Sequence, residues 1–99
     1  MKLLGHQRKY LRSLAHHLKP KVVIGKHGIN DGCISSIKDA FNTDEIIKIK
    51  IHENKNVDKQ ISYIANEVKC NIVGHVGKIL IFYKENKTKE LRKIILPIK

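Results

Sequence analysis

The sequence predicts a compact single α/β domain of order α-β-α-β-α-β-β, in which three helices pack on a mixed four-stranded sheet. Segments with a helical apolar period alternate along the chain with short apolar or alternating segments, which is typical of a sheet covered by helices. Only a glycine turn separates the last two predicted strands, so they form an antiparallel hairpin beside strands that crossovers make parallel. At 99 residues the chain is long enough for one core but not for two, so we expect one domain over residues 1–99.

The first predicted helix spans residues 5–18 and ends before Pro20. Its apolar face follows from helical spacing and comprises Leu4, Leu11, Leu14, Ala15 and Leu18. A basic stripe runs beside this face, with three members at i, i+4 and i+8 and two close neighbours: Arg8, Arg12, His16, Lys9 and Lys19. Like charges at this spacing repel one another, and an anion bound across the stripe would offset that cost.

A glycine-framed loop follows the next short strand, residues 21–24, and precedes a second helix that begins at the N-cap Asn30 and runs to about residue 42. The loop consists of Gly25, Lys26, His27 and Gly28. Glycines allow positive φ and let a ligand approach the backbone closely. A helix N-terminus favours an anion and Lys26 adds a full charge, so the loop is predicted to contact phosphate. The alternative is an ordinary turn before a capped helix.

Residues 45–52 alternate between apolar and polar side chains, as a half-buried strand does. Ile47, Ile49 and Ile51 are expected to face the core. The opposite side is then a basic outer face, formed by Lys48, Lys50 and His52. Lys48, Lys50 and Lys78 would extend the basic surface of the first helix if they face it.

The remaining predicted elements complete the order. A third helix covers residues 57–69, and a strand covers residues 71–76. After a glycine turn, residues 78–84 form the most apolar strand, which we expect to be central in the sheet. A short last strand over residues 91–96, ended by Pro97, is a further prediction.

The positive charge of the chain is large and uneven. The net charge is +11, and the first thirty residues hold seven Lys or Arg and no Asp or Glu. A polyanion is therefore the expected partner, with a merely solubilising surface as the alternative. Aromatic residues are few, and packing is the favoured interpretation of Tyr10 and Tyr83. Recognition is expected to rely on the backbone and shape of a nucleic acid more than on its bases.

The sequence favours a cytoplasmic protein. Cys33 and Cys70 lack CxxC spacing and are expected to be reduced, part-buried thiols. No apolar stretch approaches the length of a membrane span, and the N-terminus lacks the apolar core of a signal peptide. A basic amphipathic helix can lie on a membrane, but the domain core needs the apolar face of this one. We therefore expect no membrane partner.

Catalysis and metal binding find little support in the sequence. The pair Ser35-Ser36 lies in a predicted helix without a nucleophile elbow, and the acidic residues are scattered singly. The six histidines form no zinc-binding pattern, and the glycine loop matches neither GxxxxGK[ST] nor GxGxxG. We therefore expect no catalytic residue, no metal and no cofactor. A small enzyme acting on a phosphate ligand is kept as the distant alternative.

Several stretches, in the right order along nearly the whole chain, resemble the CRM-domain (YhbY-like) family. They are residues 7–20 (QRKYLRSLAHHLKP), 24–29 (IGKHGI), 45–50 (EIIKIK), 76–84 (VGKILIFYK) and 95–97 (ILP). The resemblance implies a fold similar to the C-terminal domain of translation initiation factor three and one CRM-like RNA-binding domain over residues 1–99. It also implies RNA contact through the GxxG loop, as in KH domains. Stand-alone bacterial members of the family are associated with precursors of the large ribosomal subunit, and plant organellar relatives act in intron splicing.

Three positions depart from the family pattern. Gly5 replaces a helix-capping Ser or Thr, which predicts fraying at the start of the first helix. Gly74 replaces a bulkier polar residue and would loosen its strand. Lys84 replaces a frequent Arg and keeps the charge without the planar fork.

Together these observations predict an RNA-binding protein that contacts ribosomal RNA precursors and serves as a large-subunit assembly factor. The expected RNA-binding residues are Gly25, Lys26, His27 and Gly28 in the loop, with Arg8, Lys9, Arg12, His16 and Lys19 beside them. The protein is expected to be a monomer. The main alternative is a general RNA-binding module or RNA chaperone without ribosomal specificity.

Overall fold

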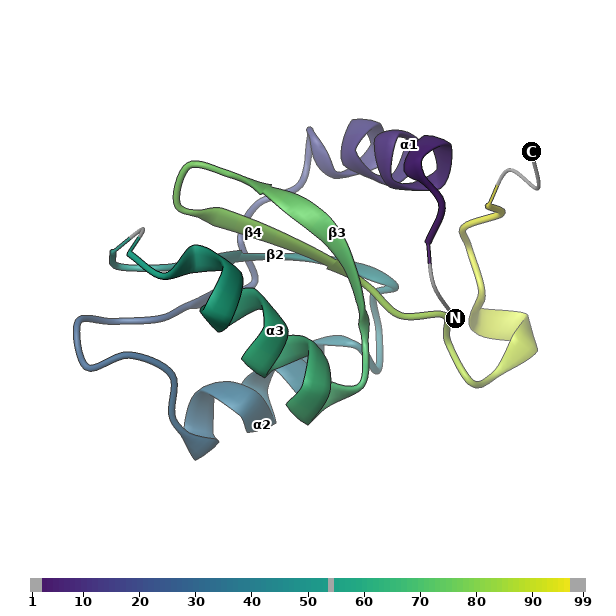
Figure 1. The fold of residues 1–99 in the computed structure, drawn as a ribbon. Helices are drawn as coiled ribbons and strands as arrows, with labels where there is room; N and C mark the ends of the chain where they lie inside the picture. The colour runs from purple at the N-terminus through teal and green to yellow at the C-terminus, as the bar shows by residue number, and fades with distance from the viewer. Residues whose placement is uncertain (1–2, 54, 97–99) are drawn as a thin grey trace.

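A four-stranded sheet in the order β1-β2-β4-β3 lies between α1 on one face and the pair α2 and α3 on the other (Figure 1). The computed structural model describes residues 3–53 and 55–96. Strand β1 (Val22–Val23) pairs parallel to β2 (Ile46–Lys50), which pairs antiparallel to β4 (Ile79–Tyr83). The edge strand β3 (Asn71–Val76) pairs antiparallel to the other side of β4. The mixed four-stranded sheet and the interior position of β4 are therefore confirmed.

The helices are α1 (Gly5–Ala15), α2 (Asp31–Ala40) and α3 (Val57–Val68), and the element order is the predicted one. The side chain of Asn30 accepts the Cys33 N–H at 2.9 Å, so the predicted N-cap of α2 is confirmed. At the start of α1, the side chain of Gln7 accepts the Leu4 N–H at 2.8 Å. This bond stabilises the first turn of α1, where Gly5 in place of a capping residue led us to predict fraying.

The larger core lies between the sheet and the pair α2 and α3. Ile47, Ile49 and Ile51 of the β2 segment face it and are at most 1% exposed, as the alternation predicted. Ile37 of α2 and Ile64 of α3 meet them and are fully buried. The apolar faces of α2 and α3 are thus both packed against this side of the sheet.

A smaller core lies between α1 and the opposite face, and here two predictions hold only in part. Ile46 is buried against α1 and Lys48 is half-buried, so this part of the β2 face is covered, whereas Lys50 and His52 remain exposed as the alternation predicted. Of the predicted apolar face of α1, only Leu11 and Ala15 are buried, whereas Leu14 is 37% exposed and Leu4 is 53% exposed. Among the described residues α1 is the one α-helix on this face, and Ile94 and Leu96 of the tail, rather than a second helix, pack against the same core.

The first helix also ends earlier than predicted, at Ala15 instead of residue 18. The chain tightens there, with the Leu18 N–H donating to the Ala15 carbonyl at 2.9 Å. From β2, Lys48 Nζ donates to the carbonyl oxygens of Leu18 at 3.0 Å and His16 at 3.4 Å. A cation thus satisfies two carbonyls that the helix end leaves without helical partners.

The predicted last strand over residues 91–96 is wrong. A short 3₁₀ helix, η1 (Lys89–Leu91), is followed by irregular chain, and Pro97 lies outside the described residues. The buried Glu45 carboxylate accepts hydrogen bonds from backbone N–H groups of this region, which are then not available to pair with a strand of the sheet. It accepts from Asn86 at 3.0 Å, Lys93 at 2.7 Å and Ile94 at 3.1 Å. A charged acceptor makes such bonds strong, so this carboxylate holds the tail.

Candidate nucleic-acid interface

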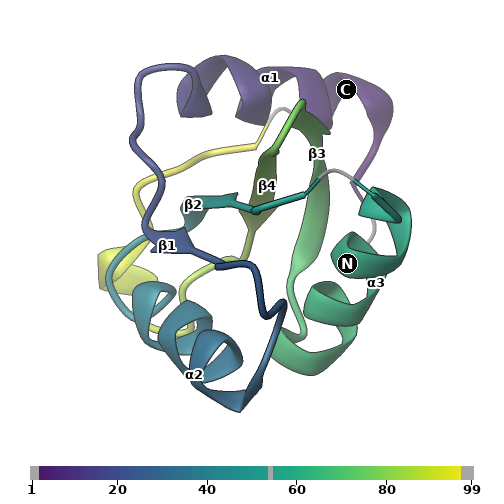
Figure 2. The same ribbon diagram turned by 90° about the vertical axis from the view of Figure 1, so that its left-hand side faces the viewer.

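Strand pairing sets three loops at one end of the sheet. Val23, Lys50, Ile79 and Val76 form the last row of the four strands, which we call the sheet end. Beyond it, the chain leaves β1 into the Gly25–Gly28 loop, leaves β2 at Ile51, and turns between β3 and β4. Figure 2 looks at this end, with α1 above and the β1–α2 connection in front. Segments far apart in the sequence therefore meet here.

The glycine loop is a tight turn that presents its two basic residues outward. The Gly28 N–H donates to the Gly25 carbonyl at 3.0 Å, and Lys26 and His27 between them are exposed. Gly28 has a φ of 82°, which favours glycine. A Cβ on Gly25 would meet no heavy atom within 4 Å, so packing inside the protein does not require glycine there. Close approach of a ligand from outside would require it.

The N-terminus of α2 contributes less to this loop than the sequence suggested. Asn30 already caps the helix through the Cys33 N–H, and Asp31 places a negative charge in the first turn. An anion at the loop must therefore be held by Lys26, His27 and exposed loop backbone.

The second wall beside the loop is formed by residues 52–53 and 55–56. A recess of about 250 Å³ lies between them, lined on the loop side by Gly25, Lys26 and Gly28 and on the other side by residues that include His52 and Lys55. Sequence reasoning missed this wall. The available signal was the parallel pairing of β1 and β2, because parallel neighbours end at the same edge of a sheet.

Gln60 of α3 holds this second wall in place. Its side-chain amide donates to the Lys55 carbonyl at 2.9 Å and to the Glu53 carbonyl at 3.3 Å. Asn56 adopts a left-handed conformation with φ 53° where the segment enters α3. Hydrogen bonds from the Gln60 side chain to backbone carbonyls thus hold this wall against α3.

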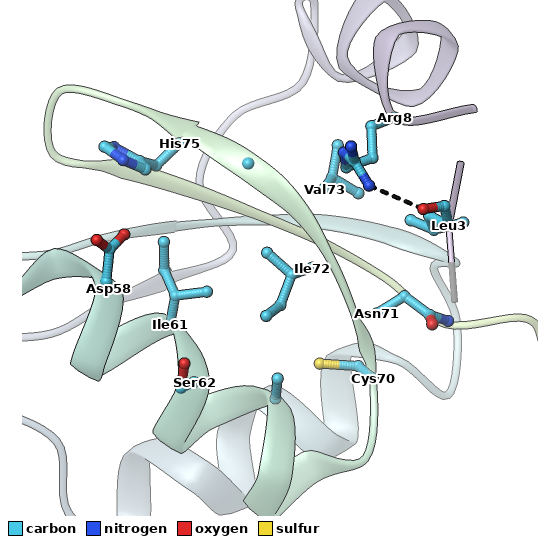
Figure 3. Close-up of a pocket in the computed structure, with 12 residues that line it drawn as sticks. Leu3, Arg8, Asp58, Ile61, Ser62, Cys70, Asn71, Ile72, Val73 and His75 are labelled. Carbon is cyan, nitrogen blue, oxygen red and sulfur yellow. Dashed lines mark hydrogen bonds between the residues drawn. The ribbon is translucent and has the colours of Figure 1, made fainter. Parts of the chain in front are cut away.

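The predicted stripe on α1 is divided by the structure. Arg8 turns to the Leu3 carbonyl at 2.8 Å and lines a depression of about 680 Å³ between the β3 edge and α3 (Figure 3). Arg12 and His16 line a different recess, which opens at the sheet end. Lys9 and Lys19 are exposed. The structure therefore brings Arg12 and His16 to the same end as the loop, but it does not bring Arg8 there.

The cations at this end lack carboxylate partners. Across residues 3–53 and 55–96 the ion pairs are Lys21–Asp44 at 3.2 Å and Arg92–Glu85 at 3.4 Å. Neither pair involves the loop or Arg12. Their charge is therefore available to an external anion.

A part-buried thiol and a buried phenol lie elsewhere and are chemically unreactive. Burial raises the pKa of the Cys70 thiol to about 12, so it is protonated at neutral pH and a poor nucleophile. Burial, reinforced by Glu45, raises the pKa of Tyr83 to about 12, and its ring belongs to the core rather than to a stacking surface. In the part of the chain that the structure describes, no His, Cys, Asp or Glu cluster suits a metal, and no helix is long and apolar enough to cross a membrane.

The fold and this cationic end define a small basic α/β domain with a glycine-framed loop, and comparison with known proteins names its class. The CRS1/YhbY (CRM) domain model matches residues 3–84, and the chain belongs to that family. It is 36% identical over 97 residues to Probable RNA-binding protein YqeI of Bacillus subtilis, covering 96% of this chain and 99% of that one. It is 38% identical over 95 residues to an RNA-binding protein of Haemophilus influenzae, covering 94% and 93%.

A solved structure has the same fold. The solution structure of SAV1595 from Staphylococcus aureus matches with a TM-score of 0.83 and 32% identity, over 96% of this chain and 99% of that one. The expected family and fold class are therefore confirmed.

Proposed function

We propose that this protein binds RNA at the sheet end, through the Gly25–Gly28 loop, the facing residues 52–53 and 55–56, and the Arg12–His16 side of α1. The single observation that carries this is the loop: Gly25 is open to the outside without an internal packing reason, and the cations beside it are unpaired. The names of the relatives in Bacillus subtilis and Haemophilus influenzae, which call them RNA-binding proteins, support the same function.

The mechanism follows from the chemistry of these groups. Lys26 and His27 stand on a turn whose backbone a phosphate can approach, and phosphate contacts position a protein on RNA without reading its sequence. Lys50 in the sheet end and Lys55 across the recess add charge to the same surface. The protein acts in this proposal by binding alone, in the cytoplasm and as a monomer.

A charge placed at the open glycine tests the loop. Gly25→Asp has room for its side chain, so the fold is kept, whereas the carboxylate would repel phosphate where a ligand approaches. We expect RNA affinity to fall about tenfold or more, because one like-charge contact costs on the order of 1.4 kcal/mol. The matched control is Lys38→Gln, which changes the net charge by the same one unit in the last turn of α2, away from the loop. Equal affinity of Gly25→Asp and the unmodified protein in filter binding, with both folded, would sink the proposal.

The finer proposal is that the RNA is a precursor of the large ribosomal subunit. Crosslinking in cells, followed by sequencing of the bound RNA, tests it directly. Enrichment confined to large-subunit ribosomal RNA is the expected result. Reads spread over many unrelated transcripts would instead assign the protein to general RNA binding or RNA chaperoning. Phosphoester hydrolysis that disappears in Lys26→Ala would overturn the view that binding is its whole activity.

A further inference from the structure

A recess on the α1 side of the sheet end combines an apolar floor with a cationic rim. It has a volume of about 380 Å³, and its lining residues are Arg12, His16, Lys48, Val76, Ile79 and Ile81. The three aliphatic residues come from β3 and β4, whereas the three basic ones come from α1, its C-cap and β2. Small-molecule sites start at about 300 Å³, so the recess has room for a base with its sugar but not for a double helix.

The rim is fixed by contacts within the protein. Lys48 Nζ is bound to the Leu18 and His16 carbonyls, which ties the end of α1 to β2 beside the recess. The Arg12 side chain lies beside Gly74 of β3. A Cβ built on Gly74 would be 3.7 Å from Arg12 Cδ and 3.8 Å from Arg12 Nη1. A Cβ there would make only ordinary van der Waals contact with the arginine. Gly74 instead has a φ of 156° where the β3–β4 register shifts, a conformation that favours glycine.

The floor is open because α1 stops short of the sheet end. Val76 is 68% exposed and Val23, in the same row, is 67% exposed. The row crosses three strand spacings, or about 14 Å, from β1, which leads into the glycine loop, to Val76. Lys50 lies exposed in this row between the loop and the recess. Apolar and basic groups therefore follow one continuous line.

We propose that this recess receives an unpaired base of the bound RNA, while the glycine loop holds the backbone nearby. The proposal rests on the proposed RNA binding and adds a base-dependent contact to it. Unpaired bases stack on apolar side chains and on guanidinium planes, and the aliphatic floor and Arg12 offer both. The rim is wholly basic, which suits the phosphates flanking such a base and gives a neutral apolar ligand no advantage.

An abasic RNA separates this contact from backbone binding. A single-stranded oligonucleotide and an abasic chain of the same length and charge are compared by fluorescence anisotropy. We expect the base-bearing RNA to bind about fivefold more tightly, near the low end of what one stacked base contributes. Val76→Gln should abolish this difference, because it lowers affinity for the base-bearing RNA more than affinity for the abasic chain.

Two variants make the comparison specific. Val23→Gln is the matched control, since it has the same exposure and lies in the same row but does not line the recess. It should keep the preference for bases. Arg12→Lys keeps the charge and removes the guanidinium plane, so it should lose most of the preference with little change in the salt dependence.

The outcomes separate this inference from the broader function. Equal binding of base-bearing and abasic RNA by the unmodified protein would overturn the base contact while RNA binding stands. Loss of preference in Val23→Gln as well as Val76→Gln would also overturn it, since the recess would then not be the site. An acidic peptide that displaces neither RNA but shifts the methyl resonances of Ile79 and Ile81 would assign the recess to a protein instead. Failure to bind either RNA would reject the proposed function itself.

Discussion

The two faces of the sheet are built in opposite ways. Against α2 and α3, the sheet buries a continuous aliphatic core in which Ile37, Ile49 and Ile64 are fully inaccessible. Against α1, the core is smaller and ends before the sheet does, which leaves Val76 open beside unpaired cations. The comparison teaches that one face supplies most of the stability, whereas the half-covered face and its adjoining loops supply the surface for a ligand.

The largest expected effect is the loss of stability when the core on the covered face is disrupted. Ile64→Ala removes a fully buried side chain between α3 and the sheet and should lower the free energy of unfolding by about 2–5 kcal/mol. Leu14→Ala on α1, where the side chain is 37% exposed, should cost less than half as much. Urea denaturation measures both. Similar losses at the two positions would contradict the unequal division of stability between the faces.

A smaller effect distinguishes two lysines on the half-covered face. Lys48→Met removes the donor to two carbonyls at the end of α1 and should cost about 1 kcal/mol of stability. Lys50→Met, two residues along the same strand and exposed, should leave stability unchanged. In RNA binding, Lys50→Met should reduce the log–log salt slope by about 0.7, the value for one phosphate contact on a single strand. Equal stability losses would show that Lys48 does not hold the helix end.

The contrast between the faces also explains what the sequence could predict. Ile47, Ile49 and Ile51 alternate strictly, and Asn30 precedes its helix as a cap should, so local patterns identified the large core and α2. Each of these features depends on residues close together in the sequence or on a regular period. The strand over residues 71–76 was found at its observed bounds for the same reason.

The corrections concern side chains that act over long separations in sequence. Lys48 ends α1 from a strand about thirty residues away, and Glu45 takes the tail N–H groups that a last strand would have used. Arg8 leaves the predicted stripe because its guanidinium donates to the Leu3 carbonyl. The recess at Val76 depends on where α1 ends over the sheet. No local pattern encodes such distances, so they required the structure.

The most direct test of RNA binding at the sheet end is to titrate ¹⁵N-labelled protein with single-stranded RNA and map the amide shifts. The largest changes should fall on residues 25–28, 52–53, 55–56 and 76–79, which meet at that end, while the last turn of α2 and the tail bound to Glu45 stay unchanged. Changes centred on the depression beside Arg8 and Ile72, with the sheet end unaffected, would contradict the account.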